Sequence, residues 1–253
     1  LIMATYAITR YETLSSVVNQ ICQKIGFPAS ADPAGSTDPV IIKIIAAVND
    51  AATDMLNMYP WQEMQRQGTL SVVASVPGES ERSFDLPDDY FGFVDQTQND
   101  ASVRRPVWNP LTALDWQSIK NLTPIVTFEL MWRVRENKIW FLSPPTAAHT
   151  FTYEYISQGW CTDADNPTLY KNEATKNGDT FLLDGYLISL LGRAKFQESS
   201  GFDSMFAQRD FMRAFDNRVG QSAGAPMLNI AGQAFAPFRL INGMNAPQTG
   251  YGS

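Results

Sequence analysis

Charge is scarce at one end of this 253-residue sequence, where the segment from Gln221 to Ser253 carries a single charged residue, Arg239. Disordered tails normally stay in solution through low hydrophobicity and high charge, and this segment has neither. It is also too rich in glycine, proline and asparagine to form a helix. Together these features predict an extended arm that binds a surface.

Basic residues are also few, because the chain has 19 Lys and Arg against 26 Asp and Glu, a formal net charge of −7. Sequence-independent binding of nucleic acid needs clustered Lys and Arg. The acidic balance excludes such a grip and predicts that DNA beside this protein would slide. The longest apolar run, residues 40–48, is too short to span a membrane, and we expect no membrane contact.

Cysteine and histidine are nearly absent. Cys22 and Cys161 lie far apart, which predicts core-type or edge thiols in a reducing compartment and gives no disulfide framework or metal spacing. The single histidine, His149, leaves no basis for a Ser–His or Cys–His triad, and no phosphate loop, dinucleotide fingerprint or zinc motif occurs. We interpret His149 as a surface histidine in a turn, and we predict no enzyme, metal or cofactor.

One acidic stretch is similar to the opening of a calcium loop, since Asp163 and Asp165 have the spacing of its first two ligands. The rest of the pattern fails, because Pro167 stands at position five, Thr168 replaces the glycine and Ala174 replaces the bidentate glutamate. We therefore predict a solvated loop.

Glycan chemistry remains open as an alternative function. Glu129 and Glu154 lie on the polar sides of expected strands and are the one carboxylate pair that could hydrolyse a cell-wall glycan. A glycan-binding protein would instead use exposed tryptophans, although tryptophans at alternate strand positions are usually core residues. The tryptophans in question are Trp108, Trp116, Trp132, Trp140 and Trp160.

Helical periodicity marks both ends of the chain. Thr13 can cap a helix that ends at Gly26, and Asp38 can cap a second helix that ends before Pro60. The first half of this second helix is apolar on most sides, which predicts burial against several partners.

Two further helices are expected after Asp179, the second of them capped by Asp203. The last helix is predicted to have an apolar face formed by Met212, Phe215 and Val219. It is also predicted to have an ion pair between Asp210 and Arg213, one turn apart.

The middle third alternates apolar and polar residues in short runs separated by turn residues. In "FELMWRVRENKIWF" the alternating run is followed by Glu136-Asn137, a tight-turn pair, and "HTFTYEYIS" alternates in the same way. The expected fold class is therefore α+β. A bundle-like domain of four helices is expected from residues 1–66 and 175–222, an antiparallel β-sandwich or barrel from 67–174, and an extended arm from 223–253.

Four segments in this order resemble a known family: "YETLSSVVNQICQKIG", "MYPWQEMQRQGTLSV", "FDLPDDYF" and "KIWFLSPPTAAHTFTYEY". They span about residues 11–157 and are followed by two helices and an uncharged arm. The chain resembles the head-to-tail adaptor proteins of tailed bacteriophages, which include tail tubular protein A and portal-docking head-completion factors.

The resemblance implies a structural protein of the virion neck and tail, made in the bacterial host cytoplasm. It implies a ring, twelvefold in the family, that seals the DNA channel between the portal protein and the tail or nozzle protein, with no catalytic residues. The arm would dock into the portal. Its expected anchors are Met227, Leu228, Ile230, Phe235, Phe238, Arg239, Leu240 and Ile241.

Overall fold

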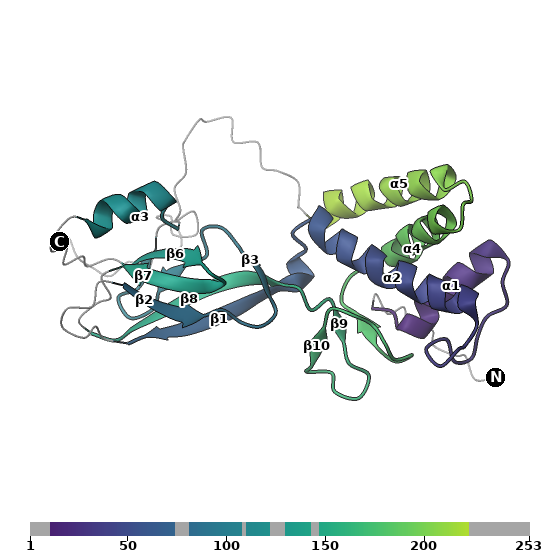
Figure 1. Cartoon of the computed structure of the whole chain (residues 1–253), viewed down its shortest axis with the longest axis horizontal. Coiled ribbons are helices and arrows are strands. Elements are labelled where there is room, and N and C mark those ends of the chain that lie inside the picture. The colour runs from purple at the N-terminus through teal and green to yellow at the C-terminus, as the bar shows by residue number, and fades with distance from the viewer. Residues whose placement is uncertain (1–10, 74–80, 108–109, 122–129, 143–146, 223–253) are drawn as a thin grey trace, which may run out of the picture.

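The computed structural model describes residues 11–73, 81–107, 110–121, 130–142 and 147–222 (Figure 1). These residues form five α-helices, one short 3₁₀ helix and eleven strands. The helices are α1 (Leu14–Ile25), α2 (Pro39–Met58), η1 (Gln62–Met64), α3 (Ala113–Lys120), α4 (Gly185–Ser199) and α5 (Met205–Ser222). The strands are β1 (Gln65–Val72), β2 (Glu81–Asp85), β3 (Tyr90–Phe93), β4 (Asn99–Asp100), β5 (Arg105–Pro106), β6 (Met131–Arg135), β7 (Lys138–Leu142), β8 (His149–Ser157), β9 (Cys161–Thr162), β10 (Tyr170–Lys171) and β11 (Thr180–Phe181).

The first two helices begin where their caps predict. The Thr13 side chain accepts a hydrogen bond from the Ser16 N–H at 3.3 Å, and Gly26 ends α1 in the left-handed conformation at φ 82°. The Asp38 carboxylate accepts from the Val40 N–H at 2.8 Å, with Pro39 as the first residue of α2. A side-chain acceptor satisfies an otherwise unpaired N–H at each helix start, and these boundaries are therefore locally encoded.

Helices α1, α2, α4 and α5 pack around one largely aliphatic core, to which the small sheet β10-β9-β11 also contributes. Trp160, Cys161 and Phe181 come from this sheet and its edge, and their side chains lie in the helical core. Figure 1 shows the small sheet beside the helices, next to the strands that lead to the larger sheets. We call α1, α2, α4, α5 and β9 to β11 the helical unit.

The remaining strands, β1 to β8, form two antiparallel sheets that with α3 make up the β unit. One sheet has the order β1-β8-β4-β5 with β3 also paired to β8, and the other has the order β2-β7-β6. Their facing side chains form a second core, in which the Phe141 and Phe151 rings join the two sheets with centroids 5.3 Å apart. The molecule is thus of the α+β class with antiparallel sheets, as expected.

The alternation predicted for "HTFTYEYIS" is confirmed in β8. Phe151, Tyr153 and Tyr155 are buried on one face of β8, while Glu154 is exposed on the other. The pair Glu136-Asn137 forms the β6–β7 turn with both φ values positive, which is the geometry of a tight hairpin.

The expected burial of the first half of α2 is incomplete. Ile44 and Val48 are fully buried, but the Ile42 side chain is 53% exposed. Within one copy, α1 and α4 cover α2 from one side, and a helix that is apolar nearly all round needs cover on the other side as well.

Candidate assembly surface

The predicted anchors of the arm, from Met227 to Ile241, lie outside the described residues, and their role stays a prediction. The structure describes helix α5, whose last residue, Ser222, precedes the predicted arm, and the turn before this helix. Asp203 caps this helix as predicted, because its carboxylate accepts from the Met205 N–H at 2.9 Å.

The buried face of α5 is offset from the predicted one. Ala207 and Phe211 are 2% exposed and point into the helical core, with Phe215 and Val219 packed beside them. Met212 was expected on this face, but its side chain is 52% exposed. Successive helical residues are turned by about 100°, so Phe211 takes the core position and Met212 lies outside it.

The predicted ion pair on α5 also differs. Asp210 contacts Arg193 of α4 at 3.5 Å and Arg209 at 3.3 Å, and no contact with Arg213 is seen among the described residues. The Arg193 contact joins two helices, which a spacing rule for a single helix does not anticipate.

Large apolar side chains remain exposed on the outer side of this region. Phe202 is 64% exposed, Met205 63%, Phe206 59% and Met212 52%. Met205 and Met212 are two helical turns apart on one face, and the Arg209 guanidinium lies between them in sequence and over the Phe206 ring at 5.3 Å. We call Phe202, Met205, Phe206 and Met212 the α5 outer face. Exposed apolar side chains that gather on one surface are a common feature of contacts between molecules.

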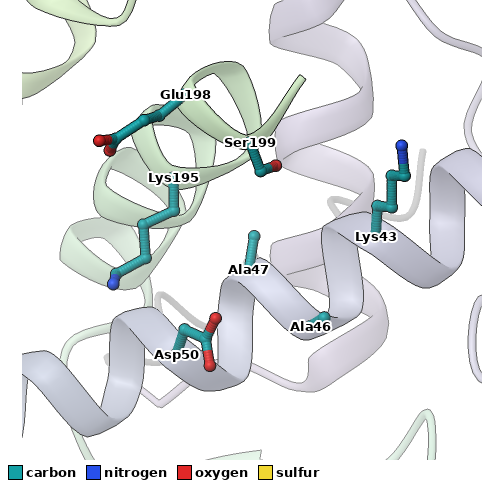
Figure 2. Close-up of a pocket in the computed structure, with 7 residues that line it drawn as sticks. All are labelled: Lys43, Ala46, Ala47, Asp50, Lys195, Glu198 and Ser199. Carbon is teal, nitrogen blue, oxygen red and sulfur yellow. The ribbon is translucent and has the colours of Figure 1, made fainter. Parts of the chain in front are cut away.

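A shallow groove of about 390 Å³ runs between α2 and α4 (Figure 2). It is lined by Lys43, Ala46, Ala47, Asp50, Lys195, Glu198 and Ser199. The small alanine side chains leave room for the backbone of another chain. Lysine and carboxylate side chains both line the groove. Lys195 is already engaged, with its Nζ 2.6 Å from Asp54 Oδ2. The hydroxyl in this groove, Ser199 Oγ, donates to the Phe196 carbonyl oxygen at 3.0 Å and is therefore not paired with a base that could activate it.

The family comparison accounts for both units together. The model of the SU10 adaptor protein family matches residues 13–235. The match begins at Thr13, the cap of α1, runs through both units and enters the arm. The chain belongs to the SU10 adaptor protein family. No curated protein matches it. Membership of this family makes the chain a structural adaptor protein of the phage type.

The stretch of the adaptor that is similar to a calcium loop is exposed from Ala164 to Tyr170, as predicted for a solvated loop, but its first aspartate, Asp163, is buried in an ion-paired cluster. The Asp163 side chain is 9% exposed, and Lys171 and Lys176 contact it at 3.0 and 3.1 Å. Asp179 is fully buried; it accepts from Lys171 Nζ at 2.7 Å and from three backbone N–H groups. Of the three aspartates, only Asp165 is mostly exposed.

These contacts set the charges of the cluster. The hydrogen bond from Lys171 holds the pKa of Asp163 well below its ordinary value. Burial alone would raise the pKa of Asp179, but the Lys171 ammonium and the backbone donors lower it. Lysine ammonium groups occupy the oxygens that a calcium ion would need. Within the described ranges, no group of His, Cys, Asp or Glu side chains could hold a metal ion.

His149 has a partner, contrary to the surface-turn interpretation. Its Nδ1 lies 2.5 Å from Asp100 Oδ2, and the two side chains are 15% and 4% exposed. Strand β4 brings Asp100 opposite Phe151 of β8, two residues from His149. The partner is 49 residues away in sequence, and only the pairing of β4 with β8 reveals it.

Among the residues of the glycan alternatives, those that the structure describes do not come together in a site. Glu154 is exposed on β8, and Glu129 lies outside the described residues, as does Trp108. Trp116, Trp132 and Trp160 are core residues, and Trp140 stacks beneath Arg135 with the guanidinium 3.9 Å from the ring centroid.

Two further expectations concern cysteines and membranes. Cys22 and Cys161 are free and buried in the helical core, and burial raises the pKa of the Cys161 thiol to about 12. Among the described helices, none combines the length and apolar content that a membrane span requires.

Proposed function

We propose that this adaptor assembles as a ring, twelvefold by analogy with related phage adaptors, between the portal and the tail. The observation that carries the proposal is the α5 outer face on a chain that belongs to an adaptor family. Large side chains that a single copy leaves in water become stabilising when a neighbouring copy covers them.

A closed ring requires every copy to present two different surfaces, one to each neighbour. We assign the α5 outer face to one of these contacts. In this arrangement the helical unit acts as a four-helix bundle that packs around the ring, and the β unit acts as a sandwich that faces the tail. The arm begins at the end of α5 and extends to the portal, where its apolar residues fill pockets and its backbone supplies hydrogen bonds.

The charge of the chain supports passage of DNA without binding. Each copy carries a formal net charge of −7, so a ring of copies surrounds its channel with an excess of carboxylates. Because retention of DNA depends on phosphate contacts with Lys and Arg, an acidic lining lets the duplex slide.

Ring formation is tested by light scattering after size exclusion, with the adaptor alone and with purified portal. A variant with Met205→Ser and Phe206→Ser should remain folded and lose the ring species. Its matched control is Leu114→Ser on α3, because Leu114 is 76% exposed but lies in the β unit. Rings that form equally well from both variants would remove the α5 outer face from the interface.

The arm is tested by deleting residues 224–253. We expect a folded protein that no longer binds the portal, with the same loss in a variant carrying Phe235→Ser and Phe238→Ser. Undiminished portal binding by the deletion variant would assign docking to another part of the chain.

A further inference from the structure

The chain crosses between the two units twice, once from α2 through η1 into β1 and once from β8 into β9 (Figure 1). The stretch "LPDDY", part of one segment that carries the family resemblance, lies at this crossing. Its second aspartate, Asp89, stands in the turn between β2 and β3. The proposed assembly does not involve this motif, yet the Asp89 side chain accepts several hydrogen bonds.

The Asp89 side chain contacts both strands that leave the β unit at the crossing, β1 and β8. Its Oδ2 accepts from Arg66 Nη1 at 2.7 Å and from Ser157 Oγ at 2.6 Å, and its Oδ1 accepts from the Tyr155 hydroxyl at 2.9 Å. The Asp89 carbonyl also accepts from the Gln158 N–H at 2.8 Å. Arg66 lies at the start of β1 and Ser157 at the end of β8, so one carboxylate ties the two connections where they leave the β unit.

Arg66 extends the contact into the helical unit. Its guanidinium carbon lies 3.4 Å from the centroid of the Tyr170 ring, and its Nη2 is 3.4 Å from the Gly159 carbonyl oxygen. Tyr170 belongs to β10, which pairs with β9, and Cys161 of β9 is buried in the helical core. The path from Asp89 through Arg66 to Tyr170 therefore connects a turn of the β unit to a strand of the helical unit.

The backbone at Gly159 packs closely against Tyr170 and has no room for a larger side chain. A Cβ added there would lie 2.8 Å from Tyr170 Cβ, closer than real Cβ atoms approach a neighbour. The Gly159 N–H donates to Ser157 Oγ at 3.0 Å, and Ser157 is fully buried. The backbone of the second crossing thus presses against Tyr170 while its polar groups are held.

We propose that Asp89, Arg66 and Tyr170 form a clasp that fixes the angle between the β unit and the helical unit. A charged hydrogen bond and a guanidinium stacked on an aromatic ring are both strongly directional, and two backbone connections alone would let the units tilt. The consequence for assembly rests on the proposed ring function. If every copy has the same angle between its two units, the copies close into a ring in which all β units face the tail in the same orientation.

The angle is measured by double electron–electron resonance on the full chain, with spin labels at Thr53→Cys on α2 and Thr69→Cys on β1. Both positions are exposed, whereas the native cysteines Cys22 and Cys161 are buried. We expect a single narrow distance distribution for the labelled parent. Tyr170→Ala and Asp89→Asn should each replace it with a broad distribution, while Tyr170→Phe, which keeps the stacked ring, should restore the narrow one.

The control is Tyr186→Ala, because Lys24 Nζ lies over the Tyr186 ring at 5.2 Å within the helical unit. It removes a comparable contact without touching the crossing and should leave the distribution narrow. Since Tyr170 is 42% exposed, its truncation should leave the chain folded, even if Asp89→Asn does not fold. A narrow, unshifted distribution in folded Tyr170→Ala would overturn the clasp.

Ring assembly of the same variants separates the clasp from the proposed function. If the parent forms rings, Tyr170→Ala should form fewer closed rings than Tyr186→Ala. If its distribution broadens but its rings are unaffected, the assembly consequence is overturned. If the parent forms no rings at all, the proposed function fails, and the distance distributions still decide the clasp.

Discussion

The two cores of this adaptor are built from different side chains. The helical core is mostly aliphatic, with Val17, Ile21, Ile44, Val48 and Ile188 fully buried between the helices. The core of the β unit is mostly aromatic, and its rings contact one another in a continuous series: Phe84, Tyr90, Phe93, Trp132, Phe141, Phe151, Tyr153 and Tyr155.

This difference teaches how each unit tolerates change. Aliphatic side chains from several helices share the helical core, so the loss of one leaves many contacts in place. In the β unit a single ring bridges several others, and its loss leaves a larger cavity. The exposed apolar side chains differ as well, since four of them lie on or just before α5 in the helical unit, whereas those of the β unit, such as Phe91 and Leu114, come from separate elements.

The largest expected effect is in the aromatic core. Phe151→Ala removes a fully buried ring that contacts Trp132, Phe141 and Tyr153, and it should cost about 4 kcal/mol. Urea unfolding followed by near-ultraviolet circular dichroism measures this loss. The aliphatic comparison is Val48→Ala, for which we expect roughly 2 kcal/mol. Equal losses would show that the two cores respond alike.

Lys171→Met tests the ion-paired cluster of the small sheet. It leaves the fully buried Asp179 without its ammonium partner and should lower the free energy of unfolding by about 3 kcal/mol at neutral pH. The control is Lys138→Met, since Lys138 pairs with the 84% exposed Asp85 side chain and should cost under about 0.5 kcal/mol.

The pH dependence of this cluster has a defined sign. The pKa values of Asp163 and Asp179 are lowered on folding, so the unfolded chain binds more protons in acid. The stability from these carboxylates is present above about pH 4 and falls as the pH drops through the folded pKa values. Urea unfolding measured from pH 3 to pH 7 should show that the free energy of unfolding rises less steeply with pH in Lys171→Met than in the parent. An unchanged slope would contradict the assigned role of Lys171.

Gly68→Ala tests the close approach of a ring to the backbone of β1. The added Cβ would lie 2.4 Å from Tyr153 Cζ, so the ring must move within the aromatic core, and we expect a loss of about 2 kcal/mol. Gly92→Ala is the control, because nothing lies within 4 Å of a Cβ there. Thermal unfolding of the two variants gives the comparison; no difference between them would show that the aromatic core yields easily.

The smallest expected effects are at helix caps, one in each unit. Asp203→Ala removes the cap of α5, which packs along the helical core, and should cost about 1 kcal/mol of global stability. Thr112→Ala removes the corresponding acceptor of α3, whose one buried residue is Trp116. Hydrogen exchange should report only local opening of α3 in that variant. Global destabilisation by Thr112→Ala would place α3 within the cooperative core of the β unit.

Local rules predicted much of this fold. Thr13, Asp38 and Asp203 each accept a backbone N–H at a predicted helix start, and Glu136-Asn137 forms a predicted turn. These features depend on interactions between residues only a few positions apart, which a sequence displays directly. An adaptor protein of the phage type was also predicted, and the model of the SU10 adaptor protein family matches residues 13–235.

Interactions across long sequence separations were missed or misplaced. The periodicity on α5 could not distinguish Phe211 from Met212, because only the packed neighbours show which of two adjacent apolar residues faces the core. The burial of Asp163 beside an otherwise exposed loop was missed, because its partner Lys171 lies eight residues further along the chain, across the pairing of β9 with β10.

Short-range chemistry thus determined where α1, α2 and α5 begin and which face of β8 is buried. Tertiary packing alone decided which polar side chains meet: His149 with Asp100, Lys171 with Asp179, and Asp89 with Arg66. The physical reason is that a buried charge is stable only beside a partner. That partner is chosen by strand register and by the crossing between units, neither of which is a property of any short stretch of residues.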